Sequence, residues 1–233
     1  MLTLSELQQE LQQLADSTQQ ENLQRFFKTG EGEYGEGDIF LGIKVPVQRK
    51  VAKKYQKLPL SDIQTLLQSK IHEYRFTALI LLISRYTQAN DSQKLPLFDF
   101  YLNNTQYINN WDLVDISAPK IIGHYLLDKP RDILYQLARS THLWERRIAI
   151  IATMPFIKQQ DFKDTLRLAE ILLNDEHDLI HKAVGWMLRE VGKQDQTVEE
   201  DFLNQYSQKM PRTMLRYAIE KLSKEKRQFY LKK

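Results

Sequence analysis

The sequence contains no cysteine among its 233 residues, which excludes disulfide bonds, thiol nucleophiles and thiolate metal sites. It has only 8 glycines and 7 prolines, too few for a collagen-like or low-complexity chain. The longest apolar run, around residues 78–83, is far shorter than the roughly 20 residues of a membrane-spanning helix. The N-terminal segment MLTLSELQQELQQLAD lacks the basic start and apolar core of a signal peptide. We therefore expect a cytoplasmic protein with no membrane partner.

The chain also has little net charge, because its formal charge is only +3. Its basic residues are nevertheless concentrated in two segments. Residues 44–57 contain six basic side chains and no acidic one, and residues 205–233 contain nine basic and two acidic side chains. Acidic residues gather instead in segments 31–38 and 195–201. This separation predicts a basic surface for a polyanion such as nucleic acid.

Hydrophobic residues make up 42% of the chain and recur almost everywhere with the period of an α-helix. No segment shows the alternating pattern of a half-buried strand. The sequence therefore predicts an all-α fold. The expected helices cover residues 3–16, 20–28, 46–56, 61–69, 73–88, 91–103, 111–127, 130–140, 143–158, 160–174, 177–192, 196–208, 211–222 and 224–231.

A faint repeat runs through the middle of the chain. Four segments, beginning at Ile71, Ile108, Thr141 and Glu176, start with a polar turn and continue as an apolar helix, about 35 residues apart. This spacing is typical of paired-helix repeats of the tetratricopeptide and HEAT types. Stacked pairs form an α-α superhelix with a concave inner surface. We predict one HEAT-like solenoid domain over residues 1–233. The residues expected on its concave surface include Trp111, Arg147 and Trp186.

Two short motifs do not support a cofactor or metal site. The letters GEGEYG at residues 30–35 match a dinucleotide-binding pattern, but no strand precedes them and two glutamates would repel a phosphate. We expect segment Gly30–Gly35 to be a flexible connection before the basic helix. His177 and His181 have the spacing of a zinc helix, but the motif's glutamate is absent and no third ligand is evident. We expect neither a metal nor a cofactor.

The segment VGWMLREVGK, residues 184–193, places its tryptophan away from the apolar face of its helix. Trp186 lies roughly 200° around the helix from Val184, at about 100° per residue. The apolar stripe contains Ile180, Val184, Leu188 and Val191, and the residues beside Trp186 are Lys182, Arg189 and Lys193. Either another element covers this face, or it meets a partner that is flat and negatively charged.

Three other side chains have both a structural and a functional interpretation. Trp111 and Asp115 are four residues apart and therefore share a helix face. Taken alone, a core tryptophan and a capping or ion-paired aspartate are the more common roles. Arg147 precedes a run of apolar residues, and the simpler interpretation is an arginine that extends from a core helix to the surface.

Taken together, these segments resemble one family. FLGIKVPVQRK, WDLVD, WERRIAI and IHKAVGWMLREVGK occur in this order across most of the chain. They are similar to the AlkD family of bacterial alkylpurine DNA glycosylases, which are built from HEAT-like repeats. The resemblance implies that Trp111 and Asp115 flank the damaged nucleotide, with Asp115 as the catalytic carboxylate. It also implies that Trp186 completes an aromatic cleft.

The same resemblance implies a set of contacts to the DNA backbone. Arg147 and Arg189 match arginines that hold phosphates in the family. Lys182 and Lys193 lie on the same helix face as Arg189, and we assign them the same role. The chain departs from the family in two residues and one segment: Asn110 stands where close members often carry an aromatic residue, Phe26 replaces a tyrosine, and Gly30–Asp38 is longer.

The sequence thus predicts a monofunctional glycosylase of the 3-methyladenine/7-methylguanine type. It would hydrolyse the N-glycosidic bond of cationic alkylated purines in double-stranded DNA, as a monomer, in base-excision repair. One alternative is a non-catalytic binder of bent or branched DNA. Another is a helical-repeat scaffold for proteins, whose basic faces would be ordinary solvated surface.

Overall fold

The structure is a computed structural model that describes residues 2–232, and it confirms the all-α prediction. Within these residues no strand is formed, and the only β-type pairing is an isolated bridge between Ile39 and Ile71. The chain divides into two compact units, residues 1–117 (unit 1) and residues 118–233 (unit 2), which are described in turn. Between residues 2 and 232, no helix combines the length and the apolar character needed to cross a membrane.

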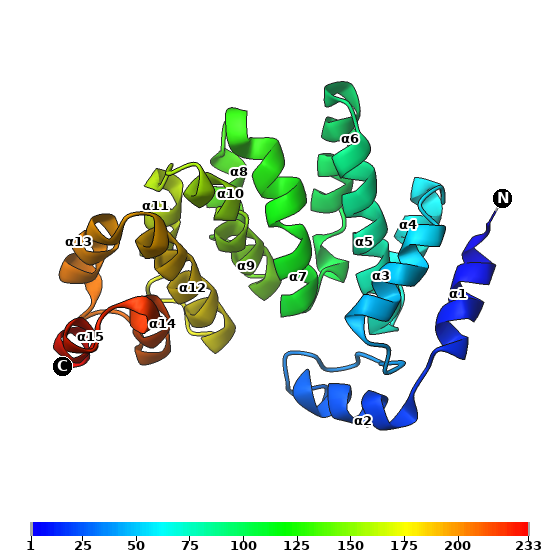
Figure 1. Cartoon of the computed structure of the whole chain (residues 1–233), viewed down its shortest axis with the longest axis horizontal. Coiled ribbons are helices and arrows are strands. Elements are labelled where there is room, and N and C mark those ends of the chain that lie inside the picture. Colours follow the sequence, from blue (N-terminus) through cyan, green and yellow to red (C-terminus); the bar gives the residue numbers. More distant parts are fainter. Residues whose placement is uncertain (1, 233) are drawn as a thin grey trace. The chain divides into compact units, whose positions relative to one another are not determined.

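Unit 1 is organised around one long helix that contacts four others, α3, α4, α6 and α7. This central helix, α5, has a largely buried surface over its first three turns, including Ala78, Leu79 and Leu82. In chain order the helices of unit 1 are α1 (Leu4–Gln13), α2 (Ser17–Phe26), α3 (Val45–Lys54), α4 (Leu60–Leu67), α5 (His72–Gln88), α6 (Asp91–Leu102), the 3-10 turn η1 (Thr105–Tyr107) and α7 (Trp111–Ser117) (Figure 1).

Local side-chain caps fix where several of these helices begin. Thr3 accepts a hydrogen bond from the backbone of Glu6, whose carboxylate accepts one in return from the Thr3 backbone. Asn90 and Gln93 form the same reciprocal pair at the start of α6, and Asp16 caps α2. Such caps satisfy backbone N–H groups that have no partner inside the helix.

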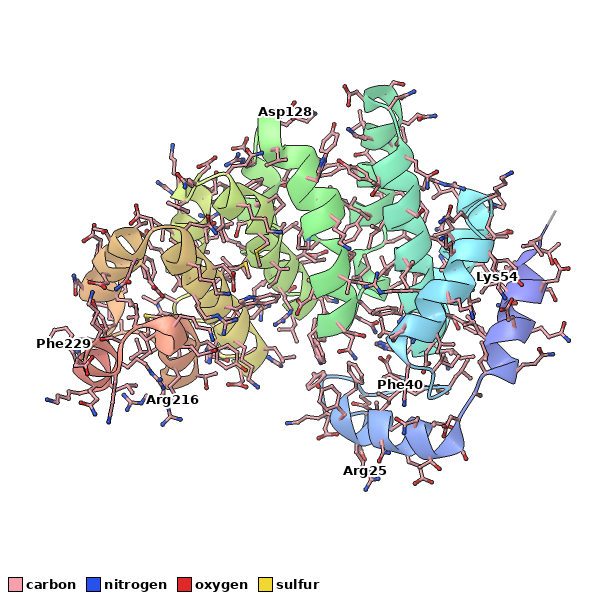
Figure 2. All side chains as sticks on the ribbon, viewed as in Figure 1. Arg25, Phe40, Lys54, Asp128, Arg216 and Phe229 are labelled. Carbon is pink, nitrogen blue, oxygen red and sulfur yellow. The ribbon has the colours of Figure 1, made fainter. Side chains whose placement is uncertain are left out.

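Unit 2 is likewise arranged around one long helix, α12, which packs against α9, α10, α11, α13 and α14. The C-terminal helices also present Arg216 and Phe229 at their exposed surface (Figure 2). The elements of unit 2 are the π-helix η2 (Pro119–Gly123), the 3-10 turn η3 (Leu126–Asp128), α8 (Asp132–Leu137), α9 (Leu143–Ile151), α10 (Met154–Lys158), α11 (Lys163–Ile171), α12 (Asp178–Gln194), α13 (Gln196–Tyr206), α14 (Arg212–Ala218), the 3-10 turn η4 (Ile219–Lys221) and α15 (Lys224–Leu231).

Prolines alter two segments that the sequence predicts as single α-helices. The segment 111–127 stays helical but passes from α7 into the π-helix η2 and then η3; Pro119 has no N–H, and the Gly123 N–H bonds to the Ala118 carbonyl five residues back. The segment 143–158 is α9 followed by α10, with Pro155 in the first turn of α10. A proline at that position clashes with the carbonyl four residues earlier, so the first helix ends at Ile151.

The apolar stripe predicted for α12 is the buried side of the helix, since Ile180, Val184, Leu188 and Val191 are all fully buried. Beside this stripe, α14 runs in the same direction as α12 and approaches it closely at Gly185. A Cβ atom on Gly185 would lie 2.4 Å from the Met214 carbonyl oxygen and 2.5 Å from the Tyr217 Cβ. The absence of a side chain at this position therefore sets the spacing between the two helices.

We expect Gly185→Ala to lower the free energy of unfolding by about 1–3 kcal/mol, because the added methyl group must push apart two packed backbones. In an exposed helix the same substitution would stabilise by about 1 kcal/mol through helix propensity. The sign of the change in the free energy of unfolding, measured by denaturant titration, therefore shows whether the two helices are tightly packed at Gly185. A stabilised variant would show that α14 adjusts freely and that Gly185 does not set the helix spacing.

Candidate functional site

In unit 1, α7 turns one face inward and leaves the other partly open to solvent. Its buried residues are Leu113, Val114 and Ser117. Trp111 and Asp115 are both half-buried on the other side, one helical turn apart, as the sequence predicts. The side-chain oxygen of Asn110 accepts a hydrogen bond from the Trp111 backbone at 2.8 Å and so stabilises the first turn of α7.

Trp111 belongs to an aromatic cluster that the sequence did not reveal. Its ring is stacked on Phe27 with the centroids 5.2 Å apart and the planes at 17°. Phe26 approaches Trp111 edge-on at 5.9 Å and is 63% exposed, whereas Phe27 is buried and stacks in turn on Phe40. Phe26 is therefore an exposed aromatic side chain directly beside Trp111. Its only sequence signal was its alignment with a family tyrosine.

A buried imidazole lies behind this cluster and bridges two carboxylates. His72, the first residue of α5, has its Nδ1 3.1 Å from an oxygen of Asp38 and its Nε2 2.9 Å from an oxygen of Asp112. Its ring also stacks on Phe40 at 4.5 Å. Asp38 accepts two further hydrogen bonds, from Arg75 at 2.6 Å and from Asn110 at 3.3 Å. The network connects the loop before α3 with the starts of α5 and α7.

Burial and ion pairing act in opposite directions on these groups. Burial by itself would lower the pKa of His72, but the charge and hydrogen bond of Asp112, with the hydrogen bond of Asp38, raise it to about 9. Burial likewise opposes ionisation of Asp38, yet its hydrogen bond to His72 and the charge of Arg75 hold its pKa below the ordinary value. At neutral pH His72 is therefore an imidazolium between two carboxylates.

A second carboxylate fixes the loop that carries Phe40. Glu73 is 1% exposed and accepts hydrogen bonds from the backbone N–H groups of Leu41, Gly42 and Ile43 at 2.8–3.2 Å. The segment Gly30–Gly35, which the sequence predicts as a flexible connection, therefore leads into a firmly bonded stretch that begins near the buried Asp38. Sequence reasoning did not single out Asp38, His72 or Glu73, because no motif connects residues that are about 35 positions apart.

In unit 2, Arg147 lies on the buried side of α9. It is 4% exposed, and its Nη1 donates a hydrogen bond of 2.5 Å to the Leu179 carbonyl oxygen in the first turn of α12. The guanidinium thus helps to join α9 to α12. Arg147 is therefore a buried structural arginine and does not extend to the surface as the simpler interpretation expected, and its role as a phosphate anchor stays a prediction.

The α12 face around Trp186 is partly open, but it is not simply cationic. Trp186 is half-buried, and its indole N–H donates to Glu190 at 3.0 Å. Lys193 contacts the same carboxylate at 2.7 Å, and Arg189 forms an ion pair with Glu220 of η4. The third cation of this face, Lys182, pairs with Asp178 at 2.7 Å, one turn earlier in α12.

The sequence indicated the position of Trp186 and its basic neighbours but missed their acidic partners. Glu190 was detectable, because a residue four positions after Trp186 must share its helix face. Glu220 was not, because it comes from another element. The two histidines of the HDLIH motif are used locally: His177 accepts a hydrogen bond from the Leu179 backbone, and His181 contacts the Asp175 carbonyl.

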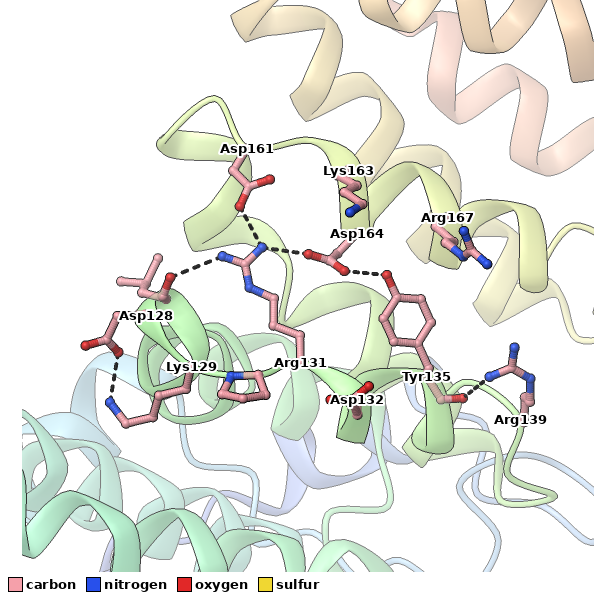
Figure 3. A pocket seen from close by; sticks show the side chains of 12 residues that line it. Asp128, Lys129, Arg131, Asp132, Tyr135, Arg139, Asp161, Lys163, Asp164 and Arg167 are labelled. Carbon is pink, nitrogen blue, oxygen red and sulfur yellow. Dashed lines mark hydrogen bonds and ion pairs between the residues drawn. The ribbon is translucent and has the colours of Figure 1, made fainter.

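A separate pocket of 760 Å³ in unit 2 lies beside the start of α8 and of α11 (Figure 3). At its centre Arg131 binds Asp161 and Asp164 at 2.6 Å each, and its guanidinium lies 3.7 Å from the ring centroid of Phe156. Tyr135 donates to Asp164 as well. These bonds join the start of α8 to the start of α11, so the central guanidinium serves as a structural connection. The sequence predicted no site here.

We expect His72→Gln to lower the free energy of unfolding by about 3–5 kcal/mol near pH 6, because it leaves Asp112 without its cation and Asp38 with Arg75 alone. The pKa of His72 is raised in the folded state, so its stabilisation is complete below its ordinary value of 6.5 and is lost as the pH rises through about 9. The difference between wild type and variant should therefore shrink toward pH 9.5. Denaturant titrations at several pH values measure it, and a difference that is constant with pH would contradict a charged His72.

Comparison with known proteins agrees with this description. The sequence profile of the DNA alkylation repair enzyme family matches residues 7–222. The fold is similar to that of a predicted DNA alkylation repair enzyme from Enterococcus faecalis, with a TM-score of 0.73 and 18% identity over 90% of this chain and 97% of that chain. That similarity supports the predicted helical-repeat fold, and a search among curated proteins finds no match. Because the profile covers most of its length, the chain belongs to the DNA alkylation repair enzyme family.

Proposed function

We propose that this protein is a monofunctional DNA glycosylase that removes cationic N3- or N7-alkylated purines from double-stranded DNA in base-excision repair. Membership of the DNA alkylation repair enzyme family supports a role in the repair of alkylated DNA. The reaction type, the lesion and the residues that carry out the reaction belong to the proposal. We propose further that the protein acts as a monomer.

The observation that carries the proposal is the pairing of Trp111 and Asp115 on the partly open side of α7. A carboxylate and an indole face are thereby presented together, one helical turn apart, with Phe26 exposed beside the indole. Carboxylates and aromatic faces both attract cations. This surface is therefore suited to a species that carries or develops positive charge.

The chemistry of an alkylated purine fits such a surface. The damaged base is already cationic, so when its bond to the sugar breaks, the electron pair of that bond makes the departing base neutral. Positive charge then develops on the deoxyribose, where we assign Asp115 to stabilise it and to orient the attacking water. The water oxygen bonds to C1′ and releases one proton. A cationic leaving group needs no Schiff base, so we assign no lysine nucleophile.

For unit 2 we propose contacts to the same class of DNA. Trp186 is assigned to the deoxyribose, and Arg189, Lys182 and Lys193 are assigned to phosphates. These three cations are already held in ion pairs with carboxylates of unit 2, so phosphate contact requires an exchange of partners. Arg147 is also assigned to the backbone, although its guanidinium is the most buried of the four. Phosphate contacts of this kind fix position without reading base sequence.

We expect Asp115→Asn to reduce release of 7-methylguanine from alkylated DNA by about 10²–10³-fold, because the nearly isosteric amide cannot stabilise the cationic sugar. The fold and the affinity for DNA should change little. Asp99→Asn is the matched control, since Asp99 is an exposed aspartate of the same unit. A wild-type protein that binds DNA but releases neither 7-methylguanine nor 3-methyladenine would instead support a non-catalytic DNA binder.

We expect Trp186→Ala to impair excision more than stability. Because the indole is only half-buried, its removal should lower the free energy of unfolding by about 1 kcal/mol, less than the roughly 3–5 kcal/mol of a fully buried tryptophan. Val184→Ala, at a fully buried position of the same helix, should show the opposite pattern. A denaturant titration and an excision assay on both variants show whether Trp186 acts in function or in packing. A larger stability loss for Trp186→Ala than for Val184→Ala, with excision intact, would show that Trp186 only packs.

A further inference from the structure

One carboxylate lies at the centre of the polar face of α12. A single oxygen of Glu190 is 3.0 Å from the indole nitrogen of Trp186 and 2.7 Å from the ammonium of Lys193. The same oxygen is 3.7 Å from a guanidinium nitrogen of Arg189. Glu190 thus contacts Trp186 and the two cations that follow Trp186 along the helix, Arg189 and Lys193. Its position sets how the indole edge is directed.

A second carboxylate reaches Arg189 from another element. Glu220 of η4 pairs with the Nη1 of Arg189 and is 3.2 Å from Lys221. This contact depends on the close packing of α14 along α12, because Tyr217 lies at Gly185 and Glu220 follows beside Arg189, one turn further along both helices. The guanidinium consequently lies between two carboxylates, and its side chain is only 17% exposed.

A third glutamate nearby does not compete for this guanidinium at neutral pH. Glu199 is 3% exposed and lies against Gly192. Burial, together with the neighbouring charge of Glu200, raises the pKa of Glu199 to about 8, although Arg189 acts in the opposite direction. Glu199 is therefore mostly protonated near pH 7, which leaves Glu190 and Glu220 as the charged partners of Arg189.

We propose that Glu190 and Glu220 form an acidic clamp on Arg189 and Trp186, which a DNA phosphate must displace before it can bind this face. The inference rests on the proposed function and adds a specificity role to it. A phosphate that approaches Arg189 meets two negative charges, so binding becomes an exchange of a carboxylate for a phosphate. Partly exposed pairs of this kind are weak enough to be exchanged. The clamp lowers affinity for undamaged duplex, and only DNA that gains additional contacts displaces it.

The first test measures binding of an undamaged labelled duplex by fluorescence anisotropy at low salt. We expect Glu220→Gln and Glu190→Gln each to increase affinity about two- to fivefold, the range that corresponds to an exposed ion pair. The matched control is Glu176→Gln, an exposed glutamate of the same unit, which should change affinity less. In an Arg189→Gln background the gain from Glu220→Gln should disappear. Equal gains for all three glutamates, or a gain that persists without Arg189, would reduce the effect to net charge and overturn the clamp.

The second test needs no DNA. Iodide is an anion that quenches tryptophan fluorescence on contact, and acrylamide is a neutral quencher that reports accessibility alone. The contribution of Trp186 is obtained by comparing each protein with its Trp186→Phe counterpart. Glu190→Gln and Glu220→Gln should raise iodide quenching of Trp186 and leave acrylamide quenching nearly unchanged, whereas Glu176→Gln should alter neither. If iodide quenching does not rise in these variants, the clamp is overturned even if excision is observed. If quenching rises but the wild-type protein excises no alkylated base, only the proposed function is overturned.

Discussion

The interaction on which unit 1 most depends is the buried imidazolium of His72 between Asp38 and Asp112. His72 and Asp38 are buried and Asp112 is half-buried, which is tolerable only because each has an oppositely charged partner and a hydrogen bond. The network is also where the loop before α3, the start of α5 and the start of α7 meet. Because Asp112 lies in the first turn of α7, this contact helps to hold α7, which carries Trp111 and Asp115, against the start of α5.

In unit 2, ion pairs also hold charged side chains in place, but they lie on a partly open helix face. The cations of α12 are not left free, because Lys182, Arg189 and Lys193 each have a carboxylate partner from α12 itself or from η4. The positive charge that this face has in the sequence is therefore nearly neutralised by carboxylates in the folded chain. Partly exposed ion pairs contribute little to stability, so these cations can exchange partners, as the proposed acidic clamp requires.

Much of the fold follows from the sequence because helices are local structures. The stripe of Ile180 to Val191 identified the buried side of α12. The predictions missed the effects of two prolines. Pro155 separates α9 from α10, and at Pro119 the helix continues with π-type hydrogen bonds, since the apolar period shows which face is buried and not which residues lack an N–H.

The sequence by itself determined the all-α class, the common helix face of Trp111 and Asp115, and the placement of Trp186 opposite the apolar stripe. Each of these follows from the rotation of about 100° per residue within a single helix. Only the tertiary structure decided which groups surround these side chains: Phe27 against Trp111, Asp38 against His72 and Glu220 against Arg189. The partners lie 31 or more residues apart along the chain, and such contacts depend on how helices pack, which no local period encodes.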